Sequence, residues 1–209
     1  MNREAILCSL QHTIGVEVAE VDNDHCVIYD DATGKVTQYN FNMTNDLLAS
    51  KIHISKSVRE KIPIDKEKLT EYLLANVDEH AFLTLEGLYY VYDKSDYEEL
   101  AKKYRDCSPM DFYETKQRGV MWFDQNVCII GVNNIIERVE KTEFDNIDFK
   151  IKRRIIGVTI HELRHLMMDT TIVLPADKYP PSLGHEYRVD EYAFEVTDST
   201  VAKWMPIFN

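Results

Sequence analysis

The sequence contains no recognisable secretory signal and no long apolar run. Its first residues, MNREAILCSLQHTIG, include no basic stretch followed by an apolar core and a small-residue cleavage site. No apolar run approaches the roughly 18 residues that a transmembrane helix requires. We therefore expect a cytoplasmic protein that does not enter a membrane.

Basic residues are outnumbered by acidic ones. The 24 Lys and Arg face 36 Asp and Glu, which gives a formal net charge of −12. Binding to a phosphate backbone uses clustered Lys and Arg, so we expect neither a nucleic acid nor an anionic membrane surface as a partner. The hydrophobic fraction of 44% and the aromatic fraction of 11% are ordinary for a globular protein and exclude a disordered chain.

Signatures of several common functional sites are absent. The four cysteines form no C-x-x-C pair, so a thiolate zinc site and a thioredoxin-like motif are not expected. We expect buried thiols in a reducing compartment instead, at Cys8, Cys26, Cys107 and Cys128. No G-x-x-x-x-G-K, G-x-G-x-x-G or G-x-S-x-G occurs, so nucleotide chemistry and the serine-hydrolase elbow have no support.

The length of 209 residues predicts one large or two small domains. Strand-like and helical runs both occur, which indicates an α+β protein. Residues 1–45 form a β-rich N-terminal region, because strand-like runs alternate there with turn residues. We expect a small antiparallel sheet from the runs at 14–21, 25–29 and 36–41. Residues 46–209 would form an α+β domain, or the two regions would form one compact unit.

Helices dominate the next part of the chain. A helix is predicted over residues 45–61, ending before Pro63, which disfavours helix in the residue that precedes it. Asp65 can cap a second helix over residues 66–76.

A strand is predicted over the apolar and aromatic run at residues 81–92. Ser95 and Glu98 form a capping box that would open the helix after it. Further on, we expect a hairpin formed by residues 119–123 and 127–132. The strongest helix of the chain follows, from Asn146 or Asp148 to about Met168, and a final helix spans about 184–201.

The strongest helix contains an H-E-x-x-H motif, His161-Glu162-Leu163-Arg164-His165. Residues four apart on a helix share a face, so both imidazoles can point at one ion. Glu162 lies about 100° around the helix and can reach a water on that ion. Zinc suits such a site, because it accepts two imidazoles and a carboxylate and keeps a position for water, whose pKa it lowers toward 7.

A third ligand is expected from the final helix, where acidic residues are abundant. Glu186 is the favoured candidate, because it shares a face with Asp190, and small residues flank that face. Asp190 could then hold the other nitrogen of a ligand histidine and fix its tautomer. Glu191 and Asp190 itself remain alternative third ligands.

These motifs resemble those of the gluzincin metallopeptidases, and in particular the ImmA/IrrE-like peptidases. That pattern has a basic residue and an apolar run before H-E-L-x-H, then E-x-x-A-N-x-F-A. Here Arg153 and Arg154 precede an apolar run, and the later segment begins at Glu186. The chain departs from the pattern with Arg164 for a common Gly, Val189 for Ala and Asp190 for Asn. The similarity covers residues 119–200.

The resemblance implies a zincin-like fold, with a small antiparallel or mixed sheet packed on the active-site helix. It also implies that the runs at 119–123 and 127–132 belong to that sheet, where an edge strand would pair with an extended substrate. The alternative is that these two runs are core strands with no role in substrate binding.

The leading hypothesis is a zinc-dependent peptidase that acts on a protein or peptide, with Glu162 as the general base. One alternative is a regulatory protein-interaction module with a structural or vestigial zinc site. Another is a zinc hydrolase that acts on a non-peptide amide. We expect Arg164 to point away from the metal, at the surface or in a salt bridge. Candidates for stabilising the oxyanion are Tyr179, His185, Tyr187 and Tyr192.

Overall fold

Two sheets and the helices packed on them organise the chain. The computed structural model describes residue 7 and residues 16–21, 25–30, 34, 36–41, 43–104, 108–122, 125–169 and 185–208. Within these ranges, side chains are described except at 16, 19, 20, 30, 37, 80, 167–169 and 185–189. The described strands form a three-stranded antiparallel sheet and a four-stranded mixed sheet, so the α+β class is confirmed.

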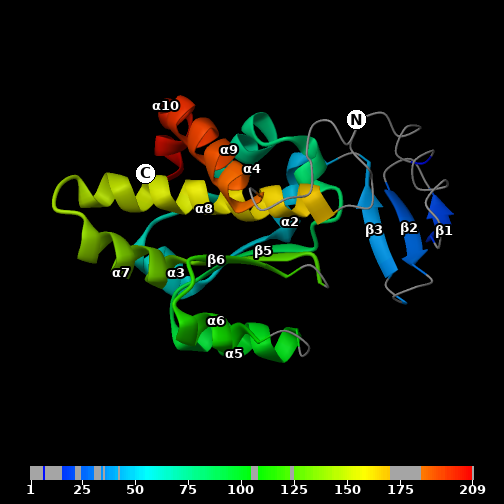
Figure 1. The fold of residues 1–209 in the computed structure, drawn as a ribbon, viewed down its shortest axis with the longest axis horizontal. Coiled ribbons are helices and arrows are strands. Elements are labelled where there is room, and N and C mark those ends of the chain that lie inside the picture. Colours follow the sequence, from blue (N-terminus) through cyan, green and yellow to red (C-terminus); the bar gives the residue numbers. More distant parts are fainter. Residues whose placement is uncertain are drawn as a thin grey trace.

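The three-stranded sheet lies at one end of the molecule (Figure 1). Its strands are β1 (Val16–Val21), β2 (His25–Asp30) and β3 (Val36–Asn40), paired antiparallel in the order β1-β2-β3 as predicted. Its buried residues pack with Leu83 from the rest of the chain. Asn40 donates to the Leu83 carbonyl from its backbone N–H at 2.8 Å and from its side-chain amide at 3.0 Å. These contacts attach the small sheet to the main body.

The continuous helix predicted over residues 45–61 is wrong. The chain instead forms α2 (Asn45–Lys51), the short strand β4 (Ile52–Ile54) and α3 (Lys56–Lys61). Ile52 and Ile54 are buried and pair with the parallel strand β5 (Gly87–Val91), while His53 between them faces outward. Ser55 then caps α3 by accepting from the Val58 N–H at 3.2 Å. Pairing with a distant strand therefore overrides the local helical preference.

The next helices show one confirmed cap and one corrected cap. Asp65 caps α4 (Lys66–Asn76), as predicted, through bonds from two backbone N–H groups. Helix α5 (Lys94–Lys103) begins after Asp93, and its capping box joins Asp93 and Asp96 instead of the predicted Ser95 and Glu98.

The strand predicted over residues 81–92 is shorter than expected. Its first part overlaps a 3-10 turn, η1 (Glu79–Phe82), and only the part from Gly87 to Val91 forms β5. The apolar residues from Ala81 to Leu85 are nevertheless buried. The apolar pattern therefore correctly indicated burial there but not strand.

The predicted hairpin is confirmed as β6 (Gly119–Trp122) and β7 (Val127–Gly131). The sheet order is β4-β5-β7-β6, in which the first three strands are parallel and β6 is an antiparallel edge strand. Two helices that were not predicted flank the hairpin in sequence, α6 (Pro109–Thr115) and α7 (Val132–Thr142).

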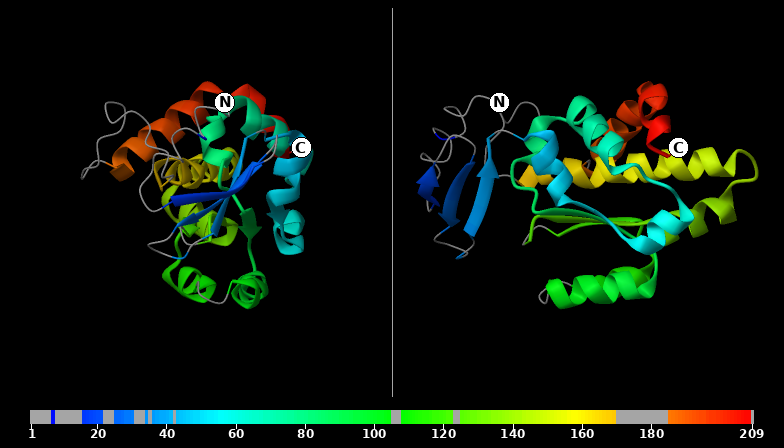
Figure 2. Two further views of the ribbon diagram at one scale, coloured as in Figure 1. Left: turned by 90° about the vertical axis from the view of Figure 1, so that its right-hand side faces the viewer. Right: turned by 180° about the vertical axis from the view of Figure 1, so that it is seen from behind.

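The mixed sheet separates two helical layers (Figures 1 and 2). Alternate residues of its central strands face opposite sides: Tyr90 and Cys128 pack with α8 (Ile147–Asp169), whereas Tyr89 and Ile129 pack with α5 and α6. Helix α9 (His185–Ser199) crosses α8 on its outer side, and the chain continues into α10 (Val201–Trp204) and η2 (Met205–Phe208). The predicted helices at the motif and near the C-terminus are thus confirmed.

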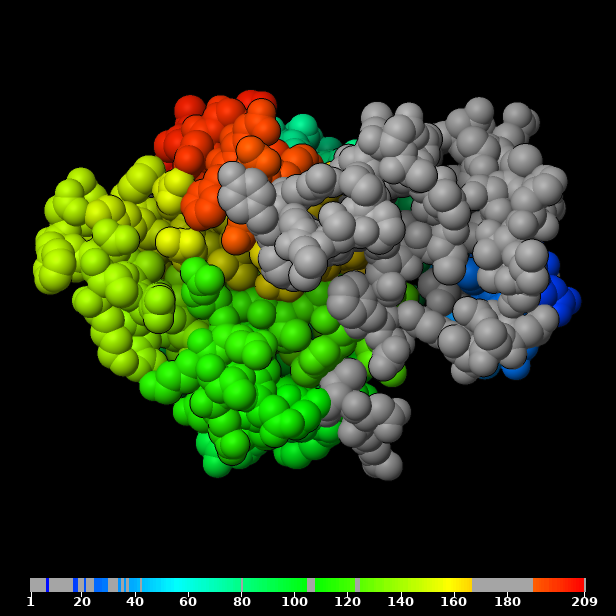
Figure 3. Space-filling view, viewed as in Figure 1, coloured from blue at the N-terminus to red at the C-terminus, as the bar shows by residue number. Residues whose placement is uncertain are grey.

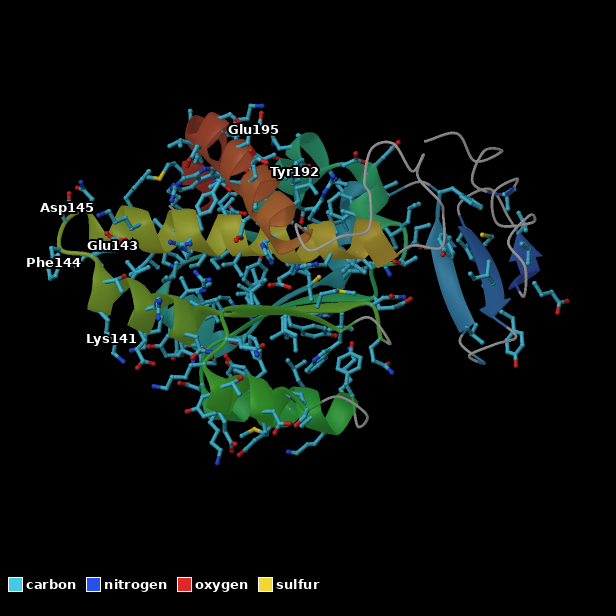
Figure 4. All side chains as sticks on the ribbon, in the orientation of Figure 1. Lys141, Glu143, Phe144, Asp145, Tyr192 and Glu195 are labelled. Atoms are coloured by element: carbon cyan, nitrogen blue, oxygen red, sulfur yellow. The ribbon has the colours of Figure 1, made fainter. Side chains whose placement is uncertain are left out.

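Helix α7 joins α8 through a turn that projects from the body of the molecule. Phe144 in this turn is 94% exposed, beside Glu143 and Asp145 (Figure 4). Lys150 on α8 stabilises the turn by donating hydrogen bonds to Glu143 at 2.8 Å and to Asp145 at 2.6 Å. This arrangement places α8 antiparallel to α7 and directs the motif end of α8 toward the small sheet.

Two further expectations concern thiols and membrane spans. Cys26 and Cys128 are buried, as predicted, whereas Cys8 and Cys107 lie outside the described residues. Burial first, and then the nearby charge of Glu162, raises the pKa of the Cys128 thiol well above its usual value. Among the described helices, none combines the length and the apolar character that a bilayer crossing requires.

Candidate metal centre

The two histidines of the motif face each other on α8. Nε2 of His161 lies 3.0 Å from Nε2 of His165. Two nitrogens bound to one tetrahedral zinc, each at about 2.0–2.1 Å, lie about 3.3 Å apart. The observed separation is close to this value, and both nitrogens that could bind an ion point into the same space. The helix therefore presents the pair in the way that the four-residue spacing predicts.

Glu162 completes a cluster that could hold a metal ion. The ligand atoms of His161, Glu162 and His165 all lie within 4.8 Å of one another. Glu162 is only 6% exposed, and its carboxylate lies directly against Gly119 at the start of β6, where a Cβ would overlap its Oε1. Imidazole nitrogens and carboxylate oxygens are common metal ligands, so a cation in this cluster fits the donors present.

Asp190 contacts His161 at the ring nitrogen that faces away from the cluster. Its Oδ1 lies 2.9 Å from Nδ1 of His161, and a carboxylate accepts, so the imidazole donates through Nδ1–H. This bond fixes the tautomer in which Nε2 carries the lone pair for a metal. The sequence had suggested this arrangement from the position of Asp190 on the final helix, and the structure brings the two residues together.

The candidates for a third ligand all lie on α9. Glu186 lies in the first turn of that helix, four residues before Asp190, and its side chain lies outside the described residues. Asp190 contacts the ring nitrogen that faces away from the cluster, so it is poorly placed to be a ligand itself. Glu191 is exposed and does not line the cavity described below.

A cavity of about 310 Å³ opens beside the cluster. Three segments line it: residues 116–119 before and at the start of β6, residues between 153 and 162 of α8, and residues between 190 and 197 of α9. Figure 3 shows this side of the molecule, with α8 in yellow between α9 in orange and, in green, the chain that leads into β6. His161 and Glu162 lie at one end of the cavity, so the cluster faces a space that a ligand can enter.

Four basic residues also line the cavity: Lys116, Arg118, Arg153 and Arg154. Arg153 and Arg154 precede His161 by about two turns of α8, so the end of the cavity away from the motif is called its basic end. The two arginines of α8 belong to the family pattern, whereas the roles of Arg118 and Gly119 are not predicted from the sequence. Arg118 does have a local signal, because the run Lys116-Gln117-Arg118 is basic in an acidic chain. Its proximity to α8 depends on how the sheet packs, which the sequence pattern does not show.

Two expectations about side chains near the motif need correction. Arg164 is buried, with 6% exposure, and its guanidinium lies over the ring of Tyr192 at 4.5 Å, so of the two expected positions, at the surface or in a salt bridge, the surface position is wrong. Tyr192 on α9 (Figure 4) accepts from the Asp78 N–H at 3.4 Å through its hydroxyl. Tyr192 therefore packs α9 against the chain near Asp78 and does not line the cavity.

The other three candidates for stabilising an oxyanion fall where side chains are not described. They are Tyr179, His185 and Tyr187.

Comparison with known proteins does not assign the chain to a family. No protein-family model matches it, and neither a curated protein nor a solved structure matches it.

Proposed function

We propose that the protein is a zinc-dependent peptidase of zincin type, in which His161, His165 and Glu186 bind the ion. The observation that carries the proposal is the 3.0 Å separation of the two Nε2 atoms with the Glu162 carboxylate in the same cluster. Asp190 adds support, because metal-binding histidines commonly donate their other ring N–H to a carboxylate. Zinc is the preferred metal for two imidazoles and one carboxylate.

Each residue has a distinct task in hydrolysis. A zinc ion held by His161, His165 and Glu186 would supply Lewis-acid chemistry for the scissile carbonyl and would lower the pKa of a bound water. Glu162 accepts a proton from the attacking water and then donates it to the nitrogen of the leaving amine. Contact with Gly119 limits the positions that its carboxylate can take. Asp190 keeps His161 in the tautomer that can bind the metal.

A peptide is the proposed substrate because of the strand beside the cluster. β6 is the edge of the mixed sheet, pairs with β7 alone among the described strands, and starts at the residue that touches Glu162. An extended peptide can add to such an edge through main-chain hydrogen bonds and would place a peptide carbonyl near the cluster. A non-peptide amide would not use this edge.

The cavity favours an enzyme over a regulatory module. A structural zinc site is closed, whereas a catalytic site keeps a position open to substrate. His161 and Glu162 line the cavity, and every described lining residue comes from position 116 onward. The described part of residues 1–110 therefore does not wall off this space.

Metal content tests the ligand set directly. We expect one zinc per chain in the purified wild type and loss of most of it in Glu186→Ala. Glu195→Ala is the matched control, because Glu195 is an exposed residue of the same helix and should not alter zinc content (Figure 4). Wild-type protein without stoichiometric zinc would contradict the proposal. Unchanged zinc in Glu186→Ala would move the third ligand to Glu191.

Glu162→Gln tests the proposed chemistry separately from metal binding. The variant should keep zinc, because both histidines remain, but should lose hydrolysis by about 10² to 10⁴-fold or more, since the base is removed. The assay is cleavage of a peptide mixture by the zinc-loaded chain, followed by mass spectrometry. Cleavage at the wild-type rate would show that Glu162 is not the base.

A further inference from the structure

The basic end of the cavity has no task in the proposed hydrolysis. Two of its four cations are paired: Lys116 with Glu137 at 2.8 Å, and Arg153 with Asp198 through bonds of 2.7 and 2.8 Å. The guanidinium groups of Arg118 and Arg154 make no hydrogen bond or ion pair with the described residues. In a chain with 36 acidic and 24 basic residues, two unpaired arginines in one cavity are unexpected.

Among the described residues, Arg154 has no acidic hydrogen-bond partner and packs against an aromatic ring instead. It is partly buried, and its guanidinium lies 5.8 Å from the centre of the Phe194 ring, on which Arg153 also rests at 5.2 Å. Burial first, and then the charges of Arg118 and Arg153, lower the pKa of Arg154, against weaker opposite effects of Asp190 and Glu143. A pre-positioned cation among like charges is the environment in which an incoming anion is most stabilised.

The distance between the two ends of the cavity matches a short stretch of peptide. Arg154 and His161 are seven residues apart on α8, which corresponds to about 10 Å along the helix axis at about 1.5 Å per residue. An extended peptide advances about 3.3 Å per residue, so about three residues cover this distance. Gly157 and Val158 line the cavity between the two ends, and neither carries a charge.

We propose that Arg118 and Arg154 bind a carboxylate of the peptide substrate, about three residues or fewer from the scissile bond. This inference rests on the proposed peptidase function and names the class of substrate. A guanidinium group matches a carboxylate because its planar N–H groups form two parallel hydrogen bonds. The carboxylate is either an Asp or Glu side chain or the free C-terminus of the peptide.

The charge of the whole molecule sharpens this selectivity. A net charge of −12 repels acidic peptides from most of the surface, whereas the basic end of the cavity attracts them. Because Arg118 is exposed, salt will screen part of this attraction, and binding of acidic peptides should weaken as ionic strength rises.

Peptide binding to the metal-free, full-length chain tests the arginines without relying on cleavage. Mixtures of short randomised peptides carry one fixed Glu or Gln and end in a free carboxylate or an amide, which separates the two sources of the carboxylate. Carboxylate-bearing mixtures should bind about ten- to a hundredfold more tightly than the neutral mixture. Arg154→Met and Arg118→Met should each remove most of this difference.

Arg138→Met is the matched control, because Arg138 is an exposed arginine of α7 that does not line the cavity. It makes the same change in net charge and should leave the preference intact. Circular dichroism and urea unfolding check that each variant is folded. Equal binding of the neutral and carboxylate-bearing mixtures, or a preference that survives both cavity variants, would overturn the proposal. So would a mixture with one fixed phosphoserine that binds more tightly than the Glu mixture.

Cleavage of the same mixtures by the zinc-loaded wild type separates this inference from the proposed function. Cleaved peptides should be enriched in a carboxylate within about three residues of the cut. Cleavage without this enrichment would refute the inference and leave the peptidase intact. Binding that depends on the two arginines in a chain that neither holds zinc nor cleaves would refute the peptidase and retain the carboxylate site.

Discussion

Replacing Gly119 by alanine tests how Glu162, the proposed base, is positioned. A Cβ at this position would lie 2.6 Å from Cγ1 of Val158 and closer still to Oε1 of Glu162. Ordinary contacts of a Cβ begin at 3.4 Å, so the neighbouring side chains must retreat by about 1 Å. Glu162 and Val158 are 6% and 9% exposed, which leaves them little room to do so.

Two consequences of Gly119→Ala can be measured. Overpacking of this kind costs about 1–3 kcal/mol, so the free energy of unfolding in urea should fall by that amount. Misplacing a catalytic group by about 1 Å can cost about a hundredfold in rate, so peptide cleavage by the zinc-loaded variant should fall by a similar factor. Zinc content should change little, because the atoms nearest to the added Cβ belong to Glu162 and Val158, which are not proposed ligands.

Gly157→Ala is the matched control for this experiment. Its Cβ would lie 3.7 Å from Oγ1 of Thr197, an ordinary contact, and Gly157 is inside α8. Alanine in a helix interior is favoured over glycine by about 1 kcal/mol, so this variant should be as stable as the wild type or more stable. A Gly119→Ala protein with wild-type stability and cleavage would refute the idea that β6 positions Glu162.

Three further predictions concern the metal, the core and the effect of pH. Asp190→Ala should weaken zinc affinity about 10- to 100-fold, measured by competition with a chelator, because the first histidine of the motif loses the carboxylate that fixes its tautomer; unchanged affinity would contradict this role. Thr159→Val should cost about 1–3 kcal/mol in urea unfolding, because the buried Tyr90 hydroxyl, 2.9 Å from Oγ1 of Thr159, loses its partner; a cost well below this range would contradict that role for the contact. Hydrogen bonds from Arg153 lower the pKa of Asp198. The stabilisation of the folded state by this ion pair is therefore present at neutral pH and is lost as the pH falls through the lowered pKa of Asp198. Asp198→Asn should cost less than about 1 kcal/mol at pH 7, because the carboxylate is half exposed, and its difference from the wild type should vanish in acid; a difference that persists there would contradict the ion pair.

The residues of the cluster could be predicted because their arrangement is set within one helix. His161 and His165 meet because four residues make about one turn, whatever the rest of the fold does. The contact of Asp190 with His161 needed one further assumption, that the acidic face of the final helix turns toward the motif. The cluster of His161, Glu162 and His165 is therefore the part of the protein that sequence reasoning describes best.

The wrong helix at residues 45–61 has a different cause. A run of three residues, Ile52 to Ile54, is too short to indicate a strand between helix-forming neighbours, and its partner β5 is far along the chain. Short strands of this kind are stabilised by pairing, which depends on tertiary structure.

The two missed helices did leave local signals. Pro109 stands at the first position of α6, where proline is favoured. Buried residues of α7 recur at helical spacing at Val132, Ile135 and Val139. Because the apolar run of β7 continues into the start of α7, the sequence does not show clearly where the strand period ends and the helical period begins.

The cavity depends on a coincidence of three segments that local patterns do not show. Helix α8 spaces the metal cluster and the arginine end along one face, so the distance between them is fixed by helix geometry. The chain before β6 adds Arg118 and, directly against Glu162, Gly119 to the lining of the cavity. Helix α9 adds Phe194, which contacts Arg154, and Asp190, which contacts His161. The three segments therefore form the cavity together, and a substrate held by the arginines would be aligned with the cluster by the same packing that builds the core.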